Sequence, residues 1–178
     1  MRSVRHVVLV GLMGSGKSTI GRRLAGAMNV PFVDTDTAVE AVSGRGIREI
    51  FSEDGEIVFR DLESQVLQDA LSMETPSVIA TGGGAVLRDV NRSLLSGHHV
   101  VWLRAEPTLL ASRVGRQANK ASGHRPLIDD DPLGRLTAMS VERRPLYESV
   151  STIVVDVDDR SPDEIVGACR RAIAGSEA

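Results

Sequence analysis

GLMGSGKST, residues 11–19, follows an apolar run at residues 7–10 and precedes a segment with apolar residues at helical spacing. It matches the pattern G-x-x-x-x-G-K-[ST] in the strand–loop–helix setting that a phosphate-binding loop (P-loop) requires. Its glycines let backbone N–H groups converge on phosphate oxygens, and the N-terminus of the following helix adds positive potential. Lys17 can reach the β- and γ-phosphates, and the Ser18 hydroxyl can bind Mg²⁺. The predicted nucleoside triphosphate site consists of Gly14, Ser15, Gly16, Lys17, Ser18 and Thr19.

Five short apolar runs predict buried strands, and helical patterns separate them along the chain. The runs are continuous rather than alternating, which is typical of a parallel sheet covered on both faces. We therefore expect a single α/β P-loop domain over residues 1–178, built in three layers around a five-stranded parallel sheet. The predicted strands are residues 7–10, 30–33, 78–80, 100–103 and 153–155.

Composition excludes several other classes of protein. The net charge is −3, from 21 basic and 24 acidic residues, whereas nucleic-acid and membrane-surface proteins are usually basic. Aromatic residues make up only 3% of the 178 residues, too few for a base-stacking platform. The single cysteine, Cys169, cannot form an internal disulfide, and the N-terminal apolar run is too short to cross a membrane. We expect a cytoplasmic monomer that binds neither nucleic acid nor membrane.

Two segments interrupt the alternation of strands and helices. Residues 34–73 carry helical patterns and no strand, which predicts a helical insertion. Residues 113–131 are polar, contain glycine and are rich in cations. A long loop of this composition is either disordered or functional, so this second segment is a disordered loop or a mobile lid.

Two carboxylates, Asp34 and Asp36, follow the second predicted strand. If the strand continues, residues i and i+2 point to the same side, and two like charges there need a cation or a proton between them. The alternative is that both cap a helix. The third strand ends in Thr81 and three glycines, without the usual Mg²⁺-binding carboxylate. Because the second strand is expected to end beside the P-loop, Asp34 is the candidate for that role, and Asp36 is left for a substrate hydroxyl.

Arginines and glycines elsewhere indicate an anionic substrate. Arg143 lies four residues after Met139 on an apolar helix face, where an unpaired cation is costly, so it needs an anionic partner. Arg60 borders the apolar seam of another helix; it is either a ligand for a carboxylate or a solvated residue paired with Asp61 or Glu63. The three glycines after Thr81 offer bare backbone to a ligand or form a flexible turn.

Taken together, the motifs resemble those of the shikimate kinase family. They are, in order, GLMGSGKSTIG, D-T-D, F-R-D, T-G-G-G, R-P-L and E-R-R-P-L-Y, and the similarity runs from about residue 7 to residue 173. The resemblance implies a fold like that of nucleoside monophosphate kinases, with a substrate-binding insertion at about 34–73 and a lid at about 113–131. It also implies transfer of the γ-phosphoryl group of ATP, with Mg²⁺, to the 3-hydroxyl of shikimate, a step toward chorismate and the aromatic amino acids.

The resemblance further implies roles for individual residues. Asp36 matches the residue that binds the 3-hydroxyl and is the proposed base, and Asp34 matches the one that holds the Mg²⁺ water shell. The implied catalytic set is Asp36, Lys17 and Arg125, of which Arg125 matches a lid arginine that touches the phosphates. The implied shikimate ligands are Arg60 and Arg143 for the carboxylate, the backbone of Gly83, and Gly82 and Gly84 beside it. On the adenine side we prefer Arg116 to Arg113 and add the loop that contains Arg160.

Two other functions have to be weighed. A gluconate-kinase-like enzyme shares the P-loop but lacks the T-G-G-G and R-x-P-L-Y patterns present in this chain. A catalytically silent ATP-binding regulator is expected to have lost Lys17, Asp36 or Arg125, and all three are present. Both comparisons favour an ATP-dependent kinase of the shikimate kinase type.

Overall fold

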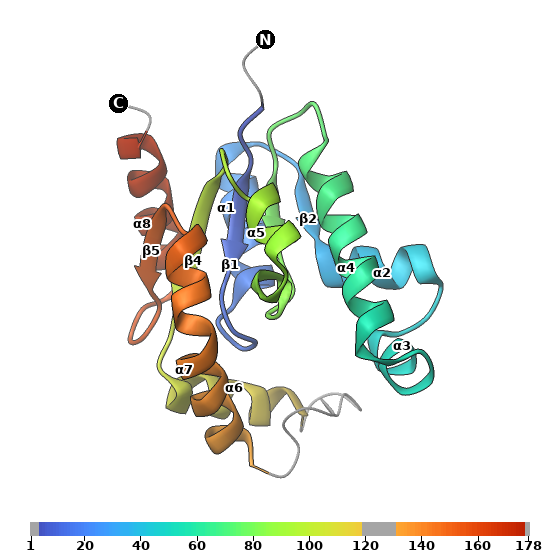
Figure 1. Cartoon of the computed structure of the whole chain (residues 1–178). Coiled ribbons are helices and arrows are strands. Elements are labelled where there is room, and N and C mark those ends of the chain that lie inside the picture. The colour runs from blue at the N-terminus through green and yellow to red at the C-terminus, as the bar shows by residue number, and fades with distance from the viewer. Residues whose placement is uncertain (1–3, 119–130, 177–178) are drawn as a thin grey trace.

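One parallel sheet forms the centre of the molecule in a computed structural model that describes residues 4–118 and 131–176. Its strand order is β2-β3-β1-β4-β5 (Figure 1). The predicted five-stranded parallel sheet is confirmed, and the observed strand ends differ from the predicted ones by at most two residues. The strands are β1 (Val7–Val10), β2 (Phe32–Asp34), β3 (Val78–Ala80), β4 (His99–Arg104) and β5 (Ile153–Asp156).

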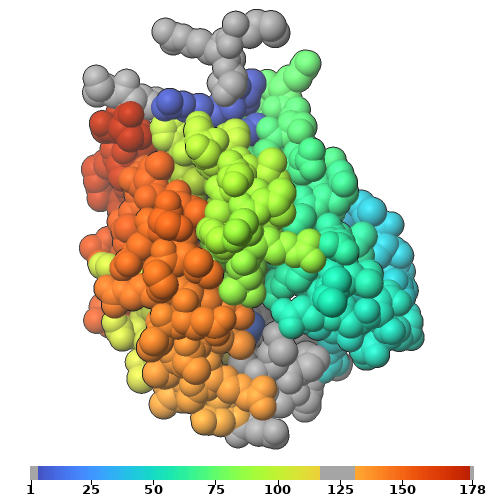
Figure 2. Space-filling view, viewed as in Figure 1, coloured from blue at the N-terminus to red at the C-terminus, as the bar shows by residue number. Residues whose placement is uncertain are grey.

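Helices cover both faces of the sheet, which explains why the inner strands β1 and β3 are apolar and buried throughout, whereas the edge strand β5 alternates between buried and exposed residues. Side chains alternate between faces along a strand. Val7 and Leu9 of β1 pack in the cluster formed with α1 (Lys17–Met28) and α8 (Pro162–Ser176). Val8 and Val10 pack in a second cluster on the opposite face. That face is covered by α4 (Gly55–Leu71), α5 (Asp89–Leu94) and α7 (Pro132–Val150), and Figure 2 shows these three helices side by side.

The segment after β2 is helical, as predicted, and has an apolar cluster of its own. It comprises α2 (Thr35–Ser43), α3 (Ile47–Glu53) and the long helix α4. Val39, Ile50, Phe59 and Val66, one or more from each helix, are buried together. This separate cluster holds the three helices as a unit at the β2 edge of the sheet (Figure 1). The assignment of this unit to substrate binding stays a prediction.

The predicted lid lies mostly outside the described residues. The helix α6 (Pro107–Ala118) already includes residues 113–118 of that segment, and Asp131 caps the start of α7 by accepting the N–H of Gly134 at 2.9 Å. Residues 119–130, among them Arg125, lie outside the described part of the chain. No helix within residues 4–118 and 131–176 combines the length and apolar character needed to cross a membrane.

The parallel arrangement brings the candidate motifs to one edge of the sheet. All strands run in the same direction, so the segments that follow β1, β2, β3, β4 and β5 leave from the same edge. These segments contain, respectively, the P-loop, the aspartate pair, the three glycines, the start of α6 and the loop with Arg160. In open α/β sheets ligands bind at this carboxyl edge, so the motifs are placed where a site is expected.

At the opposite edge, histidines cluster where β1 and β4 begin. His6 is fully buried, its Nδ1 lies 2.8 Å from Ser77 Oγ, and its backbone N–H donates to His98 Nδ1 at 3.2 Å. Burial lowers the pKa of both imidazoles, and charge on His6, His99 and Arg5 lowers the pKa of His98 further. His99 is buried as well. The start of β4 is therefore not a solvated strand edge, since His98 is half-buried and His99 is buried.

We expect the free energy of unfolding to fall when the pH is lowered from about 7.5 to about 5.5. Because the folded imidazoles resist protonation, the unfolded chain binds more protons once the pH drops through its histidine pKa of about 6.5. The stabilisation is therefore complete above that pH and lost below it. Burial raises the pKa of Glu63, which acts in the opposite direction. Urea titrations of wild type and a His6→Asn/His98→Asn variant separate the two effects; an equal pH dependence in both proteins would contradict the histidine origin.

Candidate active site

The P-loop is shaped to receive phosphate groups. Gly14 and Gly16 have φ angles of 82° and 94°, left-handed values that favour glycine, and α1 begins at the next residue, Lys17. Lys17 is buried, and its Nζ donates to the carbonyls of Gly11 at 2.7 Å and Leu12 at 3.0 Å. Ser15 Oγ is buried and has no hydrogen-bond partner among the described residues. A buried hydroxyl and an ammonium at the N-terminus of a helix fit a nucleotide phosphate.

The two aspartates do not lie on one strand face, so that prediction is wrong. β2 ends at Asp34, and Asp36 is already in the first turn of α2. Asp34 Oδ1 accepts the backbone N–H groups of Asp36 at 3.1 Å and Thr37 at 3.5 Å, so capping explains this residue. Asp36 is exposed, and its Oδ1 lies beside Gly82, 2.8 Å from where a Cβ on that glycine would stand. The helix start thus points the two carboxylates to different neighbours.

The strand order also corrects the expected position of Asp34. β3 lies between β1 and β2, so β2 does not end directly beside the P-loop strand. Asp34 is level with Ala80 of β3, which is level with Leu9 of β1. At about 4.8 Å per strand, Asp34 and Leu9 are roughly 10 Å apart. A contact of Asp34 with the water shell of Mg²⁺ is compatible with this spacing, and direct ligation beside the P-loop is not favoured.

Each of the three glycines after Thr81 makes room for a different neighbour. A Cβ on Gly82 would overlap a carboxylate oxygen of Glu63 and crowd Asp36. A Cβ on Gly83 would come within 3.2 Å of the backbone nitrogen of Met13 in the P-loop. A Cβ on Gly84 would overlap the guanidinium of Arg60. None of the three has a positive φ. Close approach rather than a flexible turn therefore explains these glycines.

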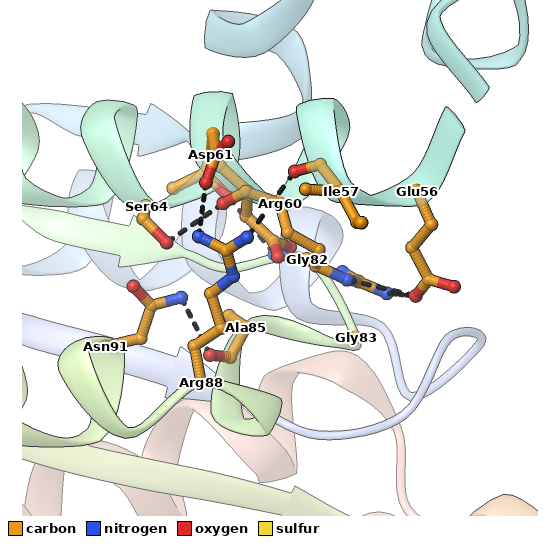
Figure 3. A network of polar contacts seen from close by, with 12 residues as sticks. Glu56, Ile57, Arg60, Asp61, Ser64, Gly82, Gly83, Ala85, Arg88 and Asn91 are labelled. Atoms are coloured by element: carbon orange, nitrogen blue, oxygen red, sulfur yellow. Dashed lines mark hydrogen bonds and ion pairs between the residues drawn. The ribbon is translucent and has the colours of Figure 1, made fainter. Parts of the chain in front are cut away.

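Arg60 is buried on α4 and forms ion pairs with two carboxylates of the same helix. Its Nη1 lies 2.8 Å from Glu63 Oε2, and its Nε and Nη2 donate to Glu56 Oε1 at 3.3 Å and 3.1 Å (Figure 3). Burial alone would lower the pKa of Arg60, but the two carboxylates outweigh it and raise that pKa. The pKa of Glu63 is raised by its own burial and by Asp36, against the influence of Arg60 and Arg143. Glu63 is therefore buried with the two guanidiniums, and the exposed Asp36 lies close enough to influence it.

A second arginine, Arg88, fastens this helix to the segment that follows the glycines. Arg88 Nη1 lies 2.6 Å from Asp61 Oδ1, and its Nη2 donates to the carbonyl of Ile57 at 3.4 Å (Figure 3). Asp61 thus pairs with Arg88, and Glu63 is the partner of Arg60. The bridge connects α4 to the start of α5, and it helps to keep Arg60 facing Gly84.

Arg143 reaches the same place from α7. It is buried, and its Nη1 donates to the carbonyl of Gly83 at 3.1 Å. Its Nε is buried without a hydrogen-bond partner among the described residues. One turn further along α7, the hydroxyl of Tyr147 donates to the same carbonyl at 2.7 Å. Its neighbour Arg144 is exposed and pairs with Glu148 on its own helix. The structure therefore brings Arg143, and not Arg144, to the glycine loop.

Comparison with known proteins identifies the family. The family model described as shikimate kinase matches residues 13–174. The chain belongs to the shikimate kinase family. A curated relative in the family, the shikimate kinase of Rhodococcus erythropolis, is 44% identical over 161 residues, which are 90% of this chain and 92% of the relative.

Solved structures agree with this family assignment. A shikimate kinase from Acinetobacter baumannii in complex with shikimate is similar with a TM-score of 0.90 and 31% identity, over 99% of this chain and 96% of that one. A gluconokinase from Sinorhizobium meliloti 1021 has a TM-score of 0.64 at 21% identity, over 99% and 95% of the two chains. The second likeness shows a shared fold alone. Membership of the shikimate kinase family makes the chain an ATP-dependent phosphotransferase that uses Mg²⁺, as the sequence predicted.

The three arginines considered for the adenine side lie in different surroundings. Arg113 Nη1 donates to the carbonyl of Gly14 in the P-loop at 3.3 Å. Arg116 is exposed and bonds to Ser112 on its own helix. Arg160 is exposed in the loop after β5. The contacts of Arg116 and Arg160 with adenine stay predictions.

Thr35 and Tyr147 were not assigned a role from the sequence, and Glu63 was named only as a possible partner of a solvated Arg60. Glu63 holds Arg60, Tyr147 holds Gly83, and the Thr35 hydroxyl accepts the backbone N–H of Gly82 at 3.1 Å. Glu63 lies three residues after Arg60, a helical spacing that signals a pair. Thr35 stands inside the D-T-D motif and Tyr147 inside R-P-L-Y, yet only the fold shows which distant glycine each one contacts.

Proposed function

We propose that the chain transfers the γ-phosphoryl group of ATP to the 3-hydroxyl of shikimate, giving shikimate 3-phosphate and ADP. The observation that carries the proposal is the meeting of two buried guanidiniums, Arg60 and Arg143, at the glycine loop beside Asp36. Shikimate is a small ring acid with three hydroxyls. A guanidinium binds a carboxylate through two parallel hydrogen bonds, and a carboxylate accepts a hydrogen bond from a hydroxyl.

The unpaired donor on Arg143 supports an anionic ligand. A buried N–H without a partner costs free energy, and buried polar groups in native proteins are nearly always paired. A ligand carboxylate would satisfy Nε and an Nη of Arg143 together. Family membership and a relative solved with shikimate support the same substrate class.

One group of residues would bind shikimate and another would bind the nucleotide. Asp36 would orient the 3-hydroxyl and accept its proton, while Arg60 and Arg143 hold the carboxylate at the far end of the ring. The P-loop backbone and Lys17 would hold the phosphates of ATP. Mg²⁺, when bound, would neutralise phosphate charge, held by Ser18 directly and by Asp34 through water. Positioning and charge compensation supply most of the catalysis in such a transfer.

Several finer assignments rest on the resemblance. We place Arg125 at the transferred phosphate, Arg160 at adenine with Arg113 or Arg116, and the whole enzyme as a monomer in the cytoplasm.

The test is an ADP-release assay with purified protein, ATP and Mg²⁺. Shikimate, quinate, gluconate and nucleoside monophosphates are supplied in turn as acceptors. We expect shikimate to give the highest kcat/KM, because only a compact hydroxy acid of its shape places a carboxylate on the arginines and a hydroxyl on Asp36. A higher kcat/KM with gluconate or a nucleotide would reject the proposal.

A further inference from the structure

A carbonyl at the centre of the site, that of Gly83, accepts two hydrogen bonds from one face of α7. Arg143 and Tyr147 are four residues apart, so they lie one above the other on the helix. Arg143 Nη1 donates at 3.1 Å and Tyr147 Oη at 2.7 Å. A carbonyl oxygen has two lone pairs and can accept both. Gly83 is also packed against the P-loop backbone at Met13, so its position is set from two sides.

Of the two donors, Tyr147 is the one whose side chain is held in place beside the Gly83 carbonyl. It is 2% exposed, and its ring stacks on Trp102 of β4 with centroids 5.5 Å apart and an interplanar angle of 21°. Burial raises its pKa well above the usual range, so the phenol keeps the proton that it donates. Arg143, by contrast, has a long side chain with a buried Nε that finds no partner in the described part of the chain. Arg143 therefore has a donor to offer a ligand, whereas Tyr147 has none to spare.

We infer that Tyr147 is a positioning residue that holds the Gly83 carbonyl so that Arg143 can turn to the substrate carboxylate. This inference rests on the proposed function, in which Arg143 binds shikimate. When Arg143 leaves the carbonyl for the ligand, Tyr147 keeps that half-buried acceptor satisfied, so the exchange leaves the carbonyl with a donor. Without the phenol, Arg143 is the only donor to this carbonyl in the described structure, and binding shikimate would leave a half-buried acceptor without a protein donor. The same bond also fixes the orientation of the Gly83 peptide, which the substrate is proposed to contact.

The experiment compares Tyr147→Phe with wild type in steady-state kinetics. The variant keeps the ring and its stacking on Trp102 and removes one hydroxyl. We expect KM for shikimate to rise about tenfold, as for the loss of one buried hydrogen bond, with KM for ATP and kcat within about twofold of wild type. Trp102→Phe is the matched control, since it weakens the stack and leaves the phenol–carbonyl bond; it should lower Tm and leave both KM values near normal.

A double-mutant cycle with Arg143→Lys measures the coupling between Tyr147 and Arg143 in shikimate binding. A purely structural role of Tyr147 would produce no such coupling. If Tyr147 acts by releasing Arg143, the two substitutions must couple in shikimate binding measured by calorimetry, and the effect of Tyr147→Phe should shrink when the arginine is already absent. An unchanged KM for shikimate in Tyr147→Phe, a proportional rise in both KM values, or additive effects in the cycle would overturn the inference. These results differ from a failure of the proposed function, in which wild type itself would not phosphorylate shikimate.

Discussion

Asp36→Asn should lower kcat by at least about a hundredfold while ATP binding stays near normal. The substitution keeps the size of the side chain and removes its negative charge, so the variant cannot accept the proton of the substrate hydroxyl. Asp36 lies exposed on the first turn of α2, with its Oδ1 beside Gly82 at the glycine loop, whereas the nucleotide phosphates belong to the P-loop backbone. Turnover is measured by ADP release and nucleotide affinity by calorimetry.

Asp34→Asn is the control for Asp36→Asn. Asp34 Oδ1 caps α2, and asparagine is an equally good cap, so the fold should be kept. We expect this variant to need more Mg²⁺ for half-maximal rate, because it weakens the water shell of the metal. The pairing of roles is wrong if Asp36→Asn retains more than about a tenth of the wild-type kcat, or if Asp34→Asn and wild type share one Mg²⁺ titration curve.

The sheet and the P-loop could be predicted because their signals are local. A strand buried on both faces needs consecutive apolar residues, and β1 shows why, since Val7 and Val8 enter different clusters. The glycines of the P-loop carry backbone angles that other residues adopt at a cost. In both cases the physical requirement falls on adjacent residues, so the sequence displays it directly.

The structure around Asp34 and Asp36 could not be predicted from neighbouring residues alone. Both the strand alternation and the helix cap were compatible with D-T-D, and the capping bonds from Asp36 and Thr37 decided between them by ending β2 at Asp34. The position of β3 between β1 and β2 was equally hidden, because strand order depends on how the crossovers pack and not on the strands themselves.

The contacts of the site could not be predicted because their partners are distant in sequence. Tyr147 and Gly83 are 64 residues apart, and Thr35 and Gly82 are 47 apart. The three glycines gave an ambiguous signal for the same reason. Whether they formed a flexible turn or a close approach depended on Glu63, Arg60 and Met13, which come from other segments. The sequence showed which residue types are present at the site, but it did not show which of them contact each other.

The two carboxylate-binding arginines differ in how cleanly they can be tested. Arg60 is the main counter-ion of Glu63, whose side chain is 1% exposed, so Arg60→Ala would leave an uncompensated buried charge and destabilise the fold. Arg143 donates to a carbonyl that Tyr147 also serves, so its removal leaves Gly83 with a donor. A loss of shikimate affinity in Arg143→Ala therefore reports on the ligand more directly than the same loss in an Arg60 variant.

Arg143→Ala should weaken shikimate binding by about 1.5–3 kcal/mol, the usual loss for a charge-assisted hydrogen bond, with ATP affinity near normal. Arg144→Ala is the matched control from the next position on α7. Arg144 is exposed, and within the described residues it pairs with Glu148 four residues on, an arrangement worth about 0.3–0.5 kcal/mol. Its removal should therefore leave shikimate binding close to wild type. Calorimetry with shikimate and with ADP measures both affinities for each variant. If Arg144→Ala weakened shikimate binding more than Arg143→Ala, the carboxylate would be held one residue further along the helix. The Nε of Arg143, which has no partner among the described residues, would then need a different ligand.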